Sequence, residues 1–149
     1  MNAFVAAGAG FLLAVLWFDL MFDVQARRSG DRVPEPALAS ISAYYARVTT
    51  AARPMNRLVA AVMLATLAAI VVQIAEGDDP VWVGWASLAL TGGAVGVAGA
   101  HTVPSAVRLG SRADPPAVQG RLARAILRDH IACLAAIAAV LVIQLAFGG

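Results

Sequence analysis

The chain has 149 residues, of which 60 % are hydrophobic and only 13 % are charged, and its mean hydropathy is +0.77. Soluble domains carry charge on about a quarter of their residues, so this composition excludes an ordinary soluble domain and indicates a membrane protein. The length corresponds to a single domain, 1–149, and we expect no second catalytic module. A net charge of +2 is explained by membrane topology, so no nucleic-acid partner is expected.

Four apolar stretches are long enough to cross a bilayer, which takes about 20 residues as a helix. They cover residues 3–24, 57–75, 81–101 and 129–147. These stretches predict an all-α fold, a four-helix transmembrane bundle in contact with the lipid bilayer. The first stretch starts without any basic residue and therefore lacks the beginning of a signal peptide, so we interpret it as a retained span.

The eleven basic residues are all arginines, and they fall in two blocks, at 27–57 and 108–128. The remaining connection, 76–80, is short and acidic. The positive-inside rule therefore places segments 25–56 and 102–128 in the cytoplasm and both termini outside. We predict a protein integral to the cytoplasmic (inner) membrane of bacterial type.

The cytoplasmic segments show helical periodicity. In the first of them the apolar residues recur every three or four positions: Leu38, Ile41, Tyr45, Val48 and Ala52. This spacing predicts an amphipathic helix along the inner membrane face until Pro54 redirects the chain. A similar stripe follows Pro116, so the fourth helix is expected to begin well before it enters the membrane.

The third span contains small residues at helical spacing. Gly92, Gly96 and Ala100 form a stripe on which another helix can pack closely. The partner is either another helix of the same chain or a second copy in a homo-oligomer. We expect the first, because the chain must pack its own helices.

Five polar residues form the constellation best suited to chemistry. Asp19 lies within the first span, where an acid costs at least about 2.5 kcal/mol, and Asp23 follows one turn later. By the deduced topology, His101 ends the third span, and Asp129 and His130 begin the fourth at a similar depth. We predict catalytic roles for Asp19, His101 and His130. Asp23 and Asp129 are predicted to bind the ligand.

Aromatic residues surround Asp19 in the sequence. Trp17, Phe18 and Phe22 are predicted to wall a ligand-binding pocket for a flat apolar molecule. The structural alternative is that they contact the core or lipid. For the acids the structural alternatives are ion pairs with nearby arginines, Asp23 with Arg27 for example.

The sequence contains no established metal-ligand spacing, so we predict no metal site. Imidazole and carboxylate ligands do suit iron, copper or zinc. His101 and His130 would also supply the two axial ligands of a haem. The cofactor is therefore left unassigned. Nucleophile elbows, phosphate-binding glycine loops and dinucleotide fingerprints are absent, which argues against nucleotide-dependent chemistry.

Three short motifs follow a small-residue-rich first span: Pro-Met-Asn at 54–56, Thr-Val-Pro at 102–104 and Arg-Asp-His-Ile-Ala-Cys-Leu-Ala at 128–135. Their order is similar to that in the anthrone-oxygenase-like family of small four-span membrane proteins. The resemblance implies a functional role for His130, which opens the last span, and oxidation of polycyclic aromatic substrates, to which some members are linked. The chain departs from the family at 128–129, where Arg-Asp replaces Trp-Asn.

Three functions are compatible with these features. The first is a membrane protein that binds a small hydrophobic ligand near the cytoplasmic face, with an oxidoreductase or oxygenase-like activity in which a histidine removes a proton. The second is a non-catalytic accessory or scaffold subunit that binds other membrane subunits. The third is a small proton-coupled transporter, although the four-span drug exporters lack large cytoplasmic helices.

Overall fold

The computed structural model describes residues 1–27, 32–51, 53–77 and 80–148, and within these ranges every regular element is a helix. In chain order the elements are α1 (Asn2–Asp23), η1 (Val24–Ala26), α2 (Glu35–Tyr45), η2 (Ala46–Ala51), α3 (Arg53–Glu76), α4 (Val81–Val97), η3 (Ala98–Thr102), α5 (Val103–Ser111) and α6 (Pro116–Phe147). The segment η1 is a 3-10 turn, whereas η2 and η3 are π-helical.

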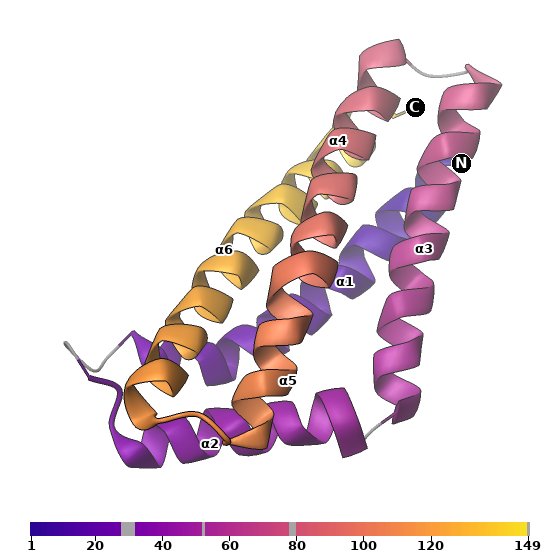
Figure 1. Cartoon of the computed structure of the whole chain (residues 1–149). Helices are drawn as coiled ribbons and strands as arrows, with labels where there is room; N and C mark the ends of the chain where they lie inside the picture. The colour runs from indigo at the N-terminus through magenta and orange to yellow at the C-terminus, as the bar shows by residue number, and fades with distance from the viewer. Residues whose placement is uncertain (28–31, 52, 78–79, 149) are drawn as a thin grey trace.

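Four helical stretches are long and apolar enough to cross a membrane: Asn2–Ala26, Pro54–Glu76, Val81–Ser111 and Pro116–Phe147. They pack side by side as a bundle, with both termini at one end and α2 lying across the other (Figure 1). The chain is therefore a multi-span integral membrane protein. The predicted all-α four-helix bundle is confirmed.

The third and fourth helices run further than the expected spans. The helix that begins as α4 continues through η3 and α5 to Ser111, and α6 already begins at Pro116. Pro104 lacks a backbone N–H, and the π-helical turn directly before it accommodates the proline without a break in the helix. The segment 102–128 therefore forms most of a helical hairpin that extends the bundle at its arginine-rich end.

The predicted amphipathic helix is present as α2 and η2, but protein covers its apolar stripe. Leu38, Ile41 and Tyr45 are buried in one cluster with Leu109 of α5 and Ile126 of α6. The stripe thus anchors α2 to the helical hairpin instead of offering an apolar face to lipid. Ala52, the last residue of the predicted stripe, lies outside the described residues.

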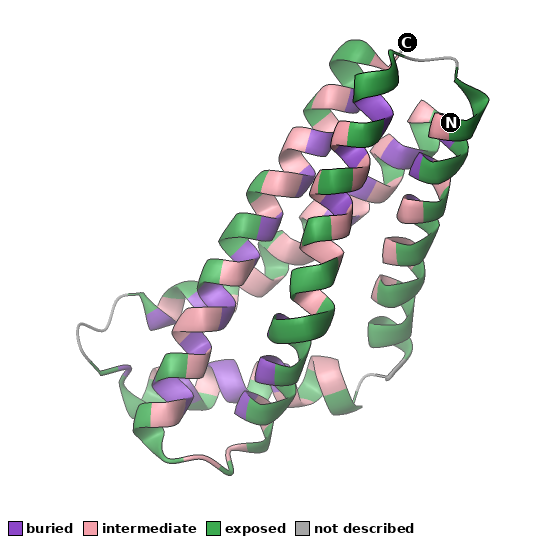
Figure 2. Cartoon of the chain, turned by 45° about the horizontal axis from the view of Figure 1, so that its top comes forward, coloured by how far each residue is buried: buried purple, intermediate pink, exposed green. Residues whose placement is uncertain are grey.

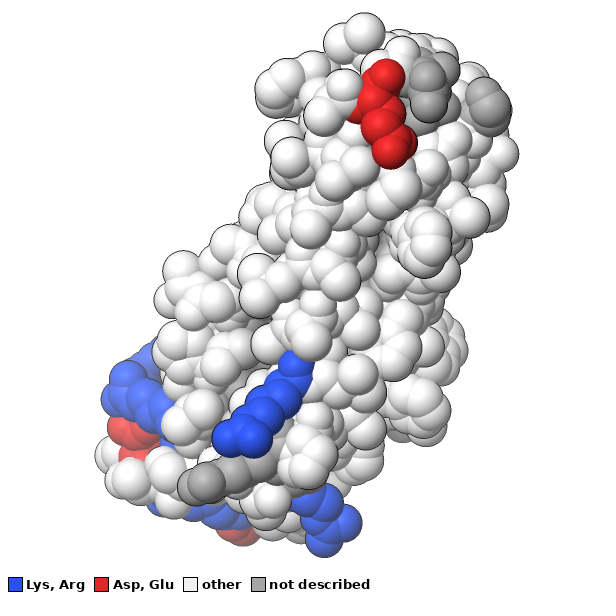
Figure 3. Space-filling view, turned by 90° about the vertical axis from the view of Figure 1, so that its right-hand side faces the viewer, with Lys and Arg blue, Asp and Glu red and all other residues white. Residues whose placement is uncertain are grey.

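The outer surface of the bundle is apolar, and its charges lie at the two ends. Figure 2 shows the buried residues turned toward the inside of the bundle and the exposed ones turned outward. On the face drawn in Figure 3, an uncharged band separates an acidic residue near one end from arginines near the other. Such a band matches the hydrocarbon layer of a bilayer.

A polar clamp joins the four long helices at the end that carries the termini. Gln73 and Gln144 exchange two side-chain hydrogen bonds, both 3.1 Å long. Gln144 also donates to Ser87 over 2.9 Å, and Gln73 donates to Asn2 over 2.6 Å. Because water is absent from the bilayer interior, such buried amides need partners on neighbouring helices, and this pairing fixes the register of the bundle.

Gly8 and Gly110 are among the glycines at which helices approach too closely for a side chain. A Cβ atom at Gly8 would overlap the side chain of Thr66, at the contact between α1 and α3. At Gly110 the obstacle is backbone, because a Cβ would lie 2.7 Å from the backbone nitrogen of Ala46. Gly110 therefore permits direct contact between α5 and η2.

The small-residue stripe of the third span faces away from the rest of the bundle. A Cβ atom at Gly92 or Gly96 would meet no atom of the described chain within 4 Å. The prediction that this stripe packs against another helix of the same chain is therefore wrong. A different face of α4, carrying the buried Ser87 and Thr91, points into the bundle.

We predict that Gly110→Ala lowers the thermal stability of the purified protein in mild detergent. The added methyl group meets backbone that must shift, and overpacking of this kind costs about 1–3 kcal/mol. Gly96→Ala is the matched control, because the same methyl group meets open space and alanine is the better helix former by about 1 kcal/mol. Circular dichroism melts measure both, and an equal loss of stability in the two variants would contradict the proposed contact.

Candidate functional site

A cavity of 160 Å³ lies inside the bundle toward the arginine-rich end. Most of its wall is aliphatic, with Leu12, Leu16, Val59, Met63 and Ile137 among the lining residues. The residues of the wall that carry polar or sulfur atoms are Asp19, Tyr44, Tyr45, Thr49, Asn56, Thr102, His130 and Cys133, besides the thioethers of Met55 and Met63. The cavity thus combines an apolar interior with a few hydrogen-bonding groups, as small-molecule sites commonly do.

His130 occupies the centre of the polar wall. Its ring lies between two carboxylates of α1, with Nδ1 2.6 Å from Asp23 Oδ2 and Nε2 3.9 Å from Asp19 Oδ2. Asp23 is completely buried, and His130 is 8 % exposed. The predicted convergence of these three residues is thus present, because the spacing of four residues places both carboxylates on the same face of α1.

Two tyrosines complete the network. Tyr44 donates a hydrogen bond to Asp19 Oδ1 and Tyr45 donates one to Asp23 Oδ1, each 2.6 Å long. Burial, together with the neighbouring carboxylate, raises the pKa of each phenol well above its usual value, so both tyrosines stay protonated and remain donors. The sequence interpretation missed both residues, although Tyr45 belongs to the apolar stripe of α2 and its hydroxyl required a partner.

The geometry gives the two carboxylates different tasks. Asp23 is completely buried, and its carboxylate accepts a hydrogen bond from the Nδ1–H group of His130, which fixes the tautomer and the orientation of the imidazole. The other ring nitrogen, Nε2, then carries a lone pair on the side of Asp19, which lines the cavity. His130 and Asp19 therefore both line the cavity, whereas Asp23 does not.

His101 and Asp129 form a second cluster of their own. His101 Nδ1 lies 2.5 Å from Asp129 Oδ2, and Thr102 donates to the same oxygen over 3.0 Å. The side chain of His101 is 56 % exposed, and it is not among the residues that line the cavity. Consecutive residues of a helix point about 100° apart, so Asp129 faces η3 while His130 faces α1. The five predicted polar residues therefore divide into two clusters.

The predicted aromatic wall is largely directed outward. Trp17 and Phe18 are 63 % and 61 % exposed on the outer face of α1, which a bilayer would cover. Phe22 lies beside the network, where its ring stacks on Tyr44 with a centroid distance of 4.0 Å. Aliphatic residues and two tyrosines line the cavity instead of the three predicted aromatic residues, none of which is among its lining residues.

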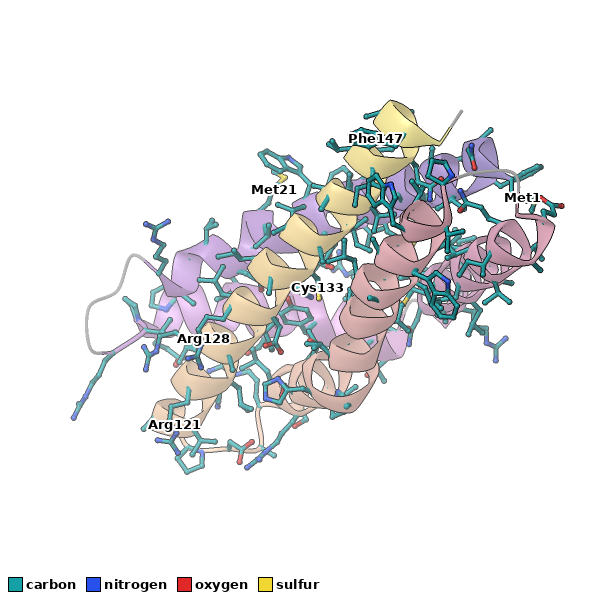
Figure 4. All side chains as sticks on the ribbon, turned by 90° about the horizontal axis from the view of Figure 1, so that it is seen from above. Met1, Met21, Arg121, Arg128, Cys133 and Phe147 are labelled. Atoms are coloured by element: carbon teal, nitrogen blue, oxygen red, sulfur yellow. The ribbon has the colours of Figure 1, made fainter. Side chains whose placement is uncertain are left out.

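Both π-helical turns adjoin the cavity. Val48 and Thr49 of η2 line it on one side, and Ala98 and Thr102 line it from η3. Cys133 of α6, which is labelled in Figure 4, lines the same wall. Single π-helical turns occur frequently at functional sites because they turn side chains out of the regular helical order.

Among the described residues, no group of three or more histidine, cysteine, aspartate or glutamate side chains could hold a metal ion. His101 pairs with Asp129, whereas the ring of His130 lies between Asp19 and Asp23. Comparison with known proteins finds no match for this chain among family models, curated proteins or solved structures.

We predict that the two clusters respond separately in NMR spectra of protein labelled with ¹⁵N in its histidines. Asp23→Asn should move the ring nitrogen resonances of His130 and leave those of His101 in place, because it removes the charge that faces only one ring. Asp129→Asn is the matched control and should move mainly the resonances of His101, whose ring lies 2.5 Å from the Asp129 carboxylate, with a smaller electrostatic effect on His130. His101→Gln and His130→Gln assign the signals, and an equally large response of both rings to either change would show a single shared cluster instead.

Proposed function

We propose that the protein binds a small, flat, largely apolar molecule with an ionisable hydroxyl group, such as a phenol or a hydroquinone, in this cavity. The observation that carries the proposal is the buried His130–Asp23 pair at the wall of an otherwise aliphatic cavity. The aliphatic wall would hold the ring system, and His130 Nε2 would accept the hydroxyl proton.

The partners of Asp19 support this proposal over a purely structural interpretation. A structural acid within a span is expected to form an ion pair with an arginine, but Asp19 accepts from Tyr44 and lies near His130. No described arginine lies within 4.0 Å of its carboxylate. The acid thus belongs to the wall of the cavity, where a ligand can reach it.

Proton removal would also prepare the ligand for oxidation. A phenolate is richer in electrons than the phenol, so it loses an electron more readily. The similarity of the motif around His130 to the anthrone-oxygenase-like family supports a polycyclic aromatic ligand and an oxidoreductase or oxygenase-like activity. We propose His130 as the residue that accepts the proton in that activity.

Binding of 1-naphthol to the purified protein in detergent tests the proposal. Its absorption spectrum distinguishes the protonated from the deprotonated hydroxyl. We expect His130→Gln to weaken binding about tenfold to a hundredfold, because a buried hydrogen bond to a charged partner contributes about 1.5–3 kcal/mol, and to abolish the absorption band of bound naphtholate.

Two further variants serve as controls for this experiment. His101→Gln changes the same residue type outside the cavity and should leave binding unchanged. Ala98→Leu fills the cavity from η3 without touching the polar network and should abolish binding while the protein stays folded. Equal binding by all three variants and the wild type would contradict the proposed site.

A scaffold function is the second candidate, and the outward stripe of Gly92, Gly96 and Ala100 favours it. Small residues without an intramolecular partner allow close approach of a helix from another molecule. Gly96→Leu would then abolish a homo-oligomer, or a complex with other membrane subunits, without unfolding the monomer. An unchanged oligomeric state would indicate that this stripe contacts lipid and not another protein.

We further propose that the arginine-rich end and the cavity face the cytoplasm, with both termini outside. In a Cys133→Ala background, Glu76→Cys should react with a membrane-impermeant maleimide in intact cells, whereas Arg121→Cys should react only after lysis. These two positions lie at opposite ends of the bundle. The reverse labelling pattern would invert the orientation.

A further inference from the structure

A second hollow lies on the outside of the bundle, where η1 meets α6. Its lining residues are Ala26, Arg27, Arg124, Leu127 and Arg128, none of which lines the cavity described above. Ala26 and Leu127 are buried, at 1 % and 6 % exposure. The hollow therefore has an apolar floor and a rim of three guanidinium groups.

The three arginines of this rim lack a counter-charge among the described residues. Arg124 and Arg128 are one turn apart on α6, so they share a face of that helix, and Arg27 approaches from the end of α1. By contrast, Arg108 pairs with Asp114 and Arg112 pairs with Glu35 at the same end of the molecule.

The lack of a hydrogen-bond acceptor is clearest at Arg124. Its terminal nitrogen Nη1 is shielded from solvent and makes no hydrogen bond within the described structure. A buried guanidinium nitrogen without an acceptor is unfavourable, and three like charges around one hollow repel each other. An anion in the hollow would remove both penalties.

The position of the hollow indicates the kind of anion. The first candidate span ends at Ala26, so the rim lies where the bundle would leave the hydrocarbon layer. On the membrane side of the rim, Met21 of α1, Val24 of η1 and Ile131 of α6 are exposed, with exposures between 40 % and 58 %. An amphiphile with an anionic head group and apolar chains fits this arrangement, because its head group would lie at the arginines and its chains against these apolar residues.

We propose that this hollow binds the phosphate headgroup of an anionic membrane lipid. The planar guanidinium groups of Arg27, Arg124 and Arg128 suit phosphate oxygens, to which arginine can donate two parallel hydrogen bonds. Basic pockets at the cytoplasmic ends of membrane helices bind lipid headgroups through this chemistry. The acyl chains then lie against the apolar outer faces of α1 and α6.

Native mass spectrometry of the full chain from mixed micelles with equal amounts of phosphatidylglycerol and phosphatidylcholine tests the proposal. We expect the wild type to retain phosphatidylglycerol about tenfold or more in preference. The triple variant Arg27→Gln, Arg124→Gln and Arg128→Gln should lose this preference. The matched triple variant Arg47→Gln, Arg57→Gln and Arg121→Gln removes the same charge from exposed positions elsewhere at this end and should keep it.

The wild-type protein alone provides a second measurement that no folding defect can affect. Phosphatidylglycerol should resist displacement by inorganic phosphate and by glycerol phosphate, because neither supplies acyl chains for the apolar faces. Displacement by inorganic phosphate would assign the hollow to a soluble phosphate compound and overturn the lipid proposal. The absence of any preference in the wild type, or an equal loss in both triple variants, would overturn it as well.

Discussion

The arrangement of the arginine-rich half of the bundle depends on one buried contact, the hydrogen bond between His130 of α6 and Asp23 of α1. Removing one partner of a buried ionic pair costs about 3–5 kcal/mol, because the other partner is left without compensation. The contact fixes the rotation of both helices about their axes. That rotation directs Asp19 to the cavity and leaves Trp17 and Phe18 on the outer face.

The two ends of the bundle use buried polar groups in different ways. At the end with the termini, Gln73 and Gln144 satisfy each other, so the cluster is a neutral clamp that holds the helices in register. At the other end, the groups around His130 are ionisable and adjoin an open cavity. The neutral clamp and the ionisable groups are thus separated along the bundle axis.

Much of the architecture could be predicted from the sequence, because span length and arginine distribution are properties of single segments. The pairing of Asp19 and Asp23 with His130 also followed from spacing and depth. The tyrosines of α2 were missed, since their partners lie more than twenty residues away in the chain. The extent of the third helix was underestimated because the π-helical turn before Pro104 leaves no clear mark in the sequence.

The sequence by itself determined four apolar helices, a charged end and an amphipathic α2, because a bilayer selects for length, hydropathy and charge along each segment. Only the tertiary structure decided which residues meet. Asp129 and His130 are neighbours in the chain but belong to different clusters, and the glycine stripe of α4 faces outward. The physical reason is that each residue turns a helix by about 100°, so contacts depend on helix rotation, and side-chain packing between helices sets that rotation.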